Sequence, residues 1–136
     1  MSLFNKVLAS IGVGSAKVDT KLHKSSYTLN ENVTGIVEIT GGSTEQQIDA
    51  IYLSLHTNFI REIDDKKIND QAMLHQFKLN EPFIIQVNEK REIPFSFALP
   101  SVVPITIGKS RVWIQTGLDI KNAVDPKDKE FIDIQP

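Results

Sequence analysis

Apolar and polar residues alternate along several short stretches of the chain, which is the pattern of β-strands that bury one face. The clearest stretch covers residues 93–100, where the apolar side chains on one side are Ile93, Phe95, Phe97 and Leu99. Burying one such side chain stabilises a fold by roughly 1.5 to 3 kcal/mol, so we expect this strand to line a hydrophobic core. Pro94 has no amide proton for a neighbouring strand, which places this strand at a sheet edge or beside a bulge.

The same alternation predicts about seven or eight strands separated by turn residues, with almost no helix. The stretches that show it are residues 15–23, 33–40, 46–63, 71–79, 83–87, 93–99, 111–120 and 131–134. Short, numerous strands of this kind are typical of two packed antiparallel sheets. We therefore predict an all-β sandwich, with a jelly roll as the nearest alternative.

The segment 46–63 is the longest predicted strand, and residues 71–79 form its return strand. Ile48 falls on the polar side of the alternation, and a bulge near Asp49 or Ala50 would restore it to the core. The inward residues of the two strands must meet across a hairpin, which centres the turn on residues 64–67. The predicted pairs are Leu55 with Phe77, Leu53 with Leu79 and Phe59 with Met73.

Near the amino terminus the apolar spacing changes to that of a helix. The residues that show it are Phe4, Val7, Leu8 and Ile11, and Gly12 and Gly14 follow them. The predicted amphipathic helix occupies residues 1–14 and is too short to be stable alone. It must dock on its own domain, on a partner chain or on a membrane surface. We therefore divide the chain into this helix and a sandwich domain over residues 15–136.

The composition argues against several classes of protein. A length of 136 residues suffices for one domain with its own core. The absence of cysteine excludes disulfides and thiolate metal sites and fits a reducing cytoplasm. Lys and Arg number 15 against 17 Asp and Glu, with no basic cluster, so nucleic acid is not an expected partner. No apolar run approaches the ~20 residues of a membrane span and no secretory signal is present, so we expect a cytoplasmic protein.

No group of side chains in the sequence predicts catalysis, a cofactor or a metal site. In the predicted hairpin His56 points outward and His75 inward, and His23 lies on the polar face of another strand, so the histidines do not converge. Four carboxylates could in principle supply calcium ligands: Asp119, Asp125, Asp128 and Glu130. Their spacing matches no calcium-binding loop and lysines alternate with them, which favours a solvated charged turn.

Trp113 falls on the opposite side of its strand from Val112 and Ile114, so the alternation predicts that it faces away from the core. A large aromatic side chain in that position would cover the helix, meet another domain or contact a partner. A bulge at Ser110 or Arg111 that turns Trp113 inward is the alternative. The candidate residues for an interdomain or partner contact are Trp113, Phe4, Leu8 and Ile11.

Several segments together carry a resemblance to a known family. They are residues 2–12, 27–37, 51–55, 93–100, 105–110, 113–121 and 125–128. Over nearly its whole length the chain resembles the amino-terminal half of bacterial sporulation-control proteins, an arrestin-like family. The resemblance implies two tandem immunoglobulin-like sandwiches, of which this chain has one.

The resemblance further implies a non-enzymatic regulator of sporulation or cell-cycle signalling that acts through protein contacts. Its expected partners are the second sandwich, other proteins, and a second copy of the chain joined through exposed sheet edges. The alternative is a ligand-binding sandwich, such as a carbohydrate or calcium module, in which Trp113 would be a stacking platform.

Overall fold

The computed structural model describes residue 3 and residues 13–136. The residues on which the predicted amino-terminal helix depends lie outside the described part of the chain. They are Phe4, Val7, Leu8 and Ile11.

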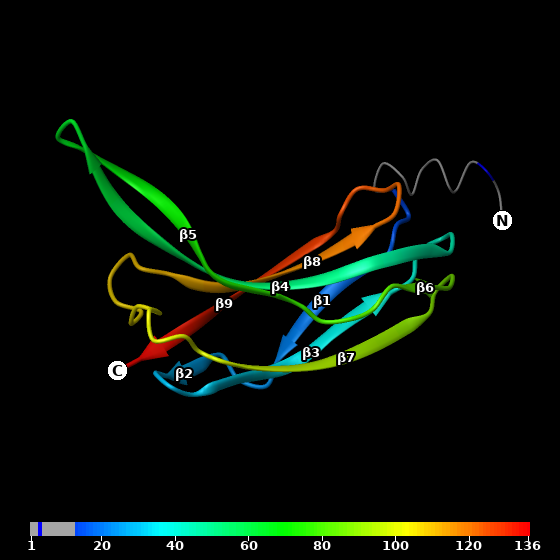
Figure 1. The fold of residues 1–136 in the computed structure, drawn as a ribbon, viewed down its shortest axis with the longest axis horizontal. Coiled ribbons are helices and arrows are strands. Elements are labelled where there is room, and N and C mark those ends of the chain that lie inside the picture. The colour runs from blue at the N-terminus through cyan, green and yellow to red at the C-terminus, as the bar shows by residue number, and fades with distance from the viewer. Residues whose placement is uncertain (1–2, 4–12) are drawn as a thin grey trace.

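The described residues form nine strands in two sheets that pack face to face (Figure 1). The strands are β1 (Lys17–Leu22), β2 (Ser26–Thr28), β3 (Asn32–Thr40), β4 (Gln46–Ile63), β5 (Lys66–Lys78), β6 (Phe83–Ile85), β7 (Lys90–Ala98), β8 (Val112–Ile120) and β9 (Lys127–Gln135). The smaller sheet has the order β1-β3-β7. The larger has the order β2-β9-β8-β4-β5, with β6 paired to β4. The prediction of an all-β fold is therefore confirmed.

The smaller sheet confirms the placement of the strand at residues 93–100. Phe95 and Leu99 are buried, and Ile93 and Phe97 pack partly buried against the core. β7 pairs with β3 alone, so Pro94 sits in an edge strand, the position in a sheet where proline is tolerated.

Gly35 lies between β1 and β7, opposite Leu22 and Phe95. A Cβ atom at this position would lie 2.5 Å from the backbone oxygen of Lys21 and 2.9 Å from the Phe95 ring. The close approach of the neighbouring chain therefore requires glycine in the middle of β3.

The larger sheet confirms the predicted bulge in β4. The register with β8 shifts between Ile48 and Ala50, and Ile48 is fully buried. The extra residue, Asp49, returns the following side chains to the alternation, so Ile51, Leu53 and Leu55 all point into the core.

The predicted register of the β4–β5 hairpin is wrong. Leu53 pairs with Phe77, and a second bulge after Leu55 shifts the pairing so that His56 meets Met73. Two aspartates, Asp64 and Asp65, adopt positive φ angles of 51° and 63° and form a two-residue turn closed by Ile63 and Lys66. Turn chemistry and a bulge, rather than the apolar pairing alone, set the register here.

Two predicted side-chain directions are also wrong, because of the bulge and the length of the hairpin. Met73 was predicted to face inward but is exposed beside His56, because the shifted register moves it to the outer face of the sheet. Phe59 was also predicted inward but is exposed, because the hairpin extends past the body of the sandwich, where no opposite sheet covers it (Figure 1).

The structure also contains a strand that the sequence did not predict. β2 lies between the stretches predicted as strands at residues 15–23 and 33–40, and it pairs with β9 in parallel, so the sandwich is not purely antiparallel. Tyr27, in the middle of β2, is almost fully buried and donates a hydrogen bond from its hydroxyl to the Lys24 carbonyl over 2.8 Å. Its ring thus anchors this short strand to the core.

Candidate interaction surface

Trp113 lies on the outer face of the larger sheet, as its position in the alternation predicted. Val112, Ile114 and Leu118 of the same strand belong to the core cluster, and no register shift between β8 and β9 turns Trp113 inward. Only 3% of Trp113 is nevertheless exposed. Neighbours on the same face therefore cover the side chain. The sequence had instead led us to expect that the helix, another domain or a partner would cover it.

The two neighbouring strands, β4 and β9, supply the cover. Trp113 of β8 pairs with His56 of β4 on one side and with Phe131 of β9 on the other. The imidazole of His56 stacks on the indole, with centroids 5.6 Å apart and planes 6° from parallel, and the Phe131 ring lies 5.9 Å away. Lys129 Nζ sits 4.3 Å from the indole centroid, as a cation–π contact requires. We call these four residues the aromatic ladder.

The surroundings of His56 favour the neutral form of its imidazole. Burial lowers the pKa of the His56 imidazole, and the positive charge of Lys129 lowers it further. Its Nε2 lies 2.7 Å from Ser54 Oγ, and the Ser54 hydroxyl donates to the Gln115 carbonyl over 3.2 Å. Because that serine has a single proton to give, Nε2 donates to Ser54 Oγ in the tautomer that satisfies both contacts.

Exposed apolar side chains lie in the ladder and beside it. Phe131 is 54% exposed, and Tyr52 and Met73 are also exposed on the same face. Tyr52, Met73 and His56 line a shallow hollow of about 360 Å³, which acidic and basic side chains also line. The outer face of the larger sheet thus combines a packed aromatic centre, exposed apolar side chains and a recess lined partly by charged groups.

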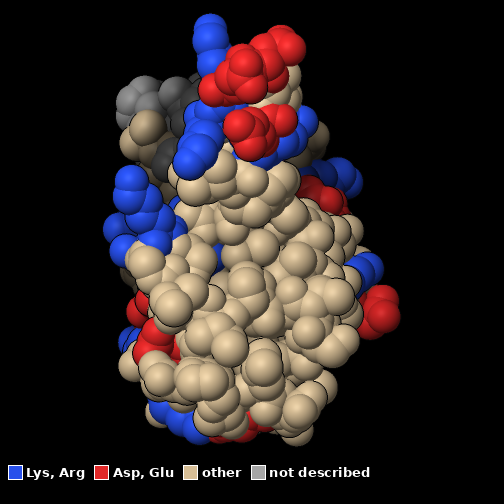
Figure 2. All heavy atoms as spheres, turned by 90° about the vertical axis from the view of Figure 1, so that its left-hand side faces the viewer, with Lys and Arg blue, Asp and Glu red and all other residues tan. Residues whose placement is uncertain are grey.

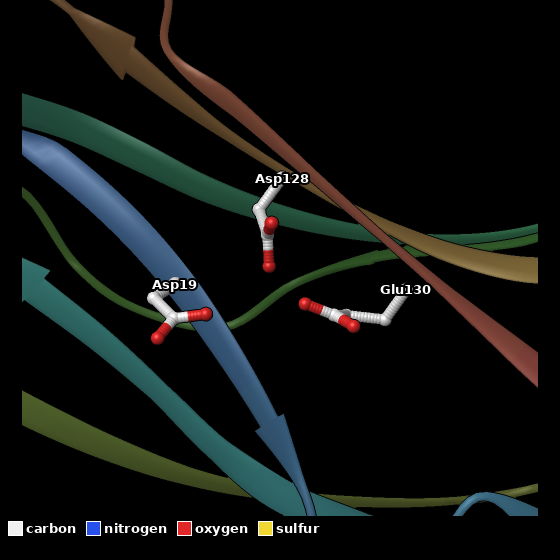
Figure 3. A group of neighbouring side chains, drawn as sticks. All are labelled: Asp19, Asp128 and Glu130. Atoms are coloured by element: carbon white, nitrogen blue, oxygen red, sulfur yellow. The ribbon is translucent and has the colours of Figure 1, made fainter.

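A second cluster of polar side chains lies where the two sheets meet (Figure 3). Asp19 of β1 faces Asp128 and Glu130 of β9, and one oxygen of each carboxylate lies within 4.8 Å of the others. The sequence had singled out Asp128 and Glu130 among four carboxylates, but the structure joins them to Asp19 and not to Asp119 or Asp125. Nothing in the sequence indicated Asp19, since it lies more than a hundred residues away.

Hydrogen bonds across the sheets explain this cluster. Asp128 Oδ2 accepts a bond from the Thr20 amide over 2.7 Å, and the hydroxyls of Thr20 and Thr116 lie 2.5 Å apart. Burial raises the pKa of the Glu130 carboxyl, and the charge of Asp128 raises it further. Asp128 therefore joins the edge of the smaller sheet to the larger one, and Glu130 lies where burial and the charges of Asp128 and Asp19 disfavour its ionised form.

The three histidines lie apart, as the sequence predicted. His56 is in the ladder, whereas His75 contacts Phe77 and Phe97 at the inner rim of the sandwich, with centroids 5.3 and 6.2 Å away. His23 Nδ1 lies 2.7 Å from the Thr34 hydroxyl.

Across residues 13–136, a helix long and apolar enough to cross a bilayer is not found.

Known proteins resemble the chain in both sequence and structure. A family model described as SpoOM protein matches residues 4–136. The sporulation-control protein Spo0M of Bacillus subtilis is 41% identical over 138 residues, an alignment that covers 100% of this chain and 54% of that protein. The chain thus spans about half the length of this relative.

Solved structures agree with the sequence match. The crystal structure of Spo0M from Bacillus subtilis superposes with a TM-score of 0.89 at 39% identity, over 91% of this chain and 51% of that one. A DNA glycosylase of Pseudomonas fluorescens, AlkC, bound to DNA that contains an abasic site analogue, gives a TM-score of 0.56 at 8% identity, over 97% of this chain and 33% of that one. The second match is evidence of a shared fold alone. The family model and the close relative together show that the chain belongs to the Spo0M family.

Proposed function

We propose that this protein is a non-enzymatic, arrestin-like interaction module that regulates sporulation through contacts with other proteins. In this proposal it is the amino-terminal of two immunoglobulin-like sandwiches. Its membership of the Spo0M family supports the link with sporulation, since the relative is named a sporulation-control protein.

The outer face of the larger sheet carries the proposal. Phe131, Tyr52 and Met73 are exposed around an aromatic centre that neighbouring strands hold in place. Aromatic and methionine side chains are enriched in protein interfaces, and rigid anchors lose little conformational entropy when a partner binds. A binding surface assembled in advance on three paired strands favours recognition of a protein.

A carbohydrate-binding role has less support from the same residues. A sugar ring stacks on an exposed aromatic face, whereas His56 covers the Trp113 indole and Lys129 sits over its ring. With 3% of its surface exposed, Trp113 presents no face for a sugar. Its position instead favours a role in holding Phe131 and His56 in place.

Two variants of the full-length protein test the proposal. Phe131→Asp and Met73→Asp place a charge on the proposed surface without removing a core side chain, because both residues are exposed. We expect both variants to change sporulation frequency and to lose co-purified partners. Val124→Asp, at an exposed position outside the hollow and the ladder, is the matched control. Sporulation frequency and partner binding equal to wild type in both surface variants would contradict the proposal.

We also propose that two copies associate through β5. This strand has 13 residues and stands at the edge of the larger sheet in the described structure, so the backbone groups on its open side are available to another strand. Sedimentation over a range of concentrations should show a dimer. A species that remains monomeric at high concentration would refute this association.

A further inference from the structure

The hairpin of β4 and β5 continues past the body of the sandwich as an arm (Figure 1). We define the arm as residues 58–71. The pairing of β4 with β8 ends at Thr57, so beyond that residue the two strands of the arm have only each other as strand partners in the described structure. A ribbon of two strands is marginally stable in water and is stabilised by further strands. The arm therefore favours the addition of another strand.

Of the sheet edges that the structure describes, the edge of β5 is the least protected. β2 and β6 have three residues each, β7 contains Pro94, and the Thr20 amide of β1 donates a hydrogen bond to the Asp128 carboxylate. Short strands, proline and covered amides all hinder the pairing of an edge with another chain. β5 has 13 residues and no proline. An added strand therefore has its best site along β5.

The backbone of the arm shows which amides point to the open side of β5. The Asn58 amide donates a hydrogen bond to the carbonyl of the residue before β8, over 3.3 Å, so it points away from its β5 partner Gln71. Because the direction alternates along an antiparallel pair, the amides of Gln71, Asn69 and Lys67 all point away from β4. The Gln71 amide donates to Oδ1 of Asp70 over 2.8 Å. The amides of Asn69 and Lys67 therefore remain for a second chain.

Charged side chains of both signs gather at the tip of the arm, at the top of Figure 2. On β5, Lys66 and Lys67 come before Asp70. Lys66, Ile68 and Asp70 lie on one face of the arm, because they are two residues apart along the strand. If two copies pair antiparallel about Ile68, Lys66 of each copy lies opposite Asp70 of the other, and opposite charges in that position are favourable. The same register places Lys67 of one copy opposite Asn69 of the other, so their open backbone groups bond to each other.

Other symmetric registers are less favourable. A centre on either lysine brings two ammonium groups together, and a centre on Asp70 brings two carboxylates together, which destabilises the pairing. A centre on Asn69 places the Asp70 carboxylate against the apolar side chain of Ile68. A centre beyond Asp70 requires the paired stretch to cross Leu74, the residue that β5 skips in its pairing with β4. The register about Ile68 has none of these faults.

We propose that two copies of this chain pair antiparallel through their arms, with Ile68 of one copy opposite Ile68 of the other and Lys66 opposite Asp70. The proposal rests on the association through β5 in the proposed function and adds its register. Ile68 is 40% exposed, so its side chain is accessible to a second copy. Arg61 Nη2 lies 3.4 Å from Asp70 Oδ2 and holds this carboxylate on the face that it shares with Lys66.

Cross-linking through an introduced cysteine tests the register, because the chain has no cysteine of its own. Since the Ile68 amide points toward β4, the two Ile68 residues form a non-hydrogen-bonded pair with Cα atoms about 4.5 Å apart, within the range of a disulfide. Under mild oxidation, Ile68→Cys should therefore form a cross-linked dimer at least about tenfold faster than Gln71→Cys. Gln71 is an exposed control on the same strand, and its two copies lie about 20 Å apart in this register. Equal rates, or faster cross-linking of Gln71→Cys, would overturn the register.

A change of charge tests the proposed ion pairs. Lys66→Asp places like charges opposite each other at two positions, so sedimentation at low salt should show a dimer that is at least about tenfold weaker. Lys78→Asp makes the same change at an exposed position of β5 outside the paired stretch and should leave the dimer unchanged. Equal dimer affinity in Lys66→Asp and wild type would overturn the proposal. A dimer that fails these tests shows that β5 associates in another register, whereas a monomer at every concentration removes the association itself, so the two failures are distinguishable.

Discussion

Replacing Trp113 with alanine tests whether the aromatic ladder stabilises the fold. The indole is 3% exposed, and an aromatic side chain buries about 150 to 250 Å². At about 25 cal/mol per Å², its removal costs roughly 4 to 6 kcal/mol before relaxation. His56 and Phe131 lie on an outer face and can close over the gap, and water can enter it, so we expect a net loss of about 3 kcal/mol.

Urea denaturation followed by circular dichroism measures this loss, because the variant has no tryptophan left to report by fluorescence. A loss of about 3 kcal/mol should also lower the Tm by about 10 °C. Phe131→Ala is the matched control on the same ladder and should cost about 1 kcal/mol, because that ring is already 54% exposed. If Trp113→Ala cost no more than Phe131→Ala, the cover described for Trp113 would be wrong.

Three further predictions follow from the geometry. Gly35→Ala should destabilise the domain by at least about 2 kcal/mol in urea denaturation, because its Cβ would collide with the Lys21 carbonyl; an unchanged midpoint would refute the close approach. Burial raises the pKa of Glu130, so its favourable effect is present in acid and is lost as the pH rises through the folded-state pKa. The Tm of Glu130→Gln minus the Tm of wild type should therefore be larger at about pH 7 than at about pH 4. The same difference at both pH values would contradict this cause. Burial lowers the pKa of His56, so protonation should quench Trp113 fluorescence only below the usual histidine range and should reduce stability there; His56→Gln should abolish the transition, and a fluorescence midpoint at or above that range would show that His56 is not buried against the indole.

The alternation of apolar and polar residues correctly predicted which face of the sheet a side chain takes where that depends on its own strand alone. The core face of β7, the edge position that Pro94 requires, the bulge that restores Ile48 and the outward direction of Trp113 all follow from a period of two residues. The physical reason is local: successive side chains of a strand point to opposite faces whatever the strand pairs with. The sequence therefore determined these facings, but not those of Phe59 and Met73, which depend on the pairing and the reach of the hairpin.

Tertiary structure decided how the strands meet. A bulge after Leu55 and a turn of two aspartates with positive φ angles moved Met73 to the outer face, and alternation within one strand does not reveal a skipped residue in its partner. The burial of Trp113 under His56 and Phe131 depends on three strands in register, and the approach of Asp19 to Glu130 joins two sheets. These features arise from contacts between distant segments, so only the folded chain specifies the ladder and the acidic cluster, whereas the sequence alone specifies the faces on which they stand.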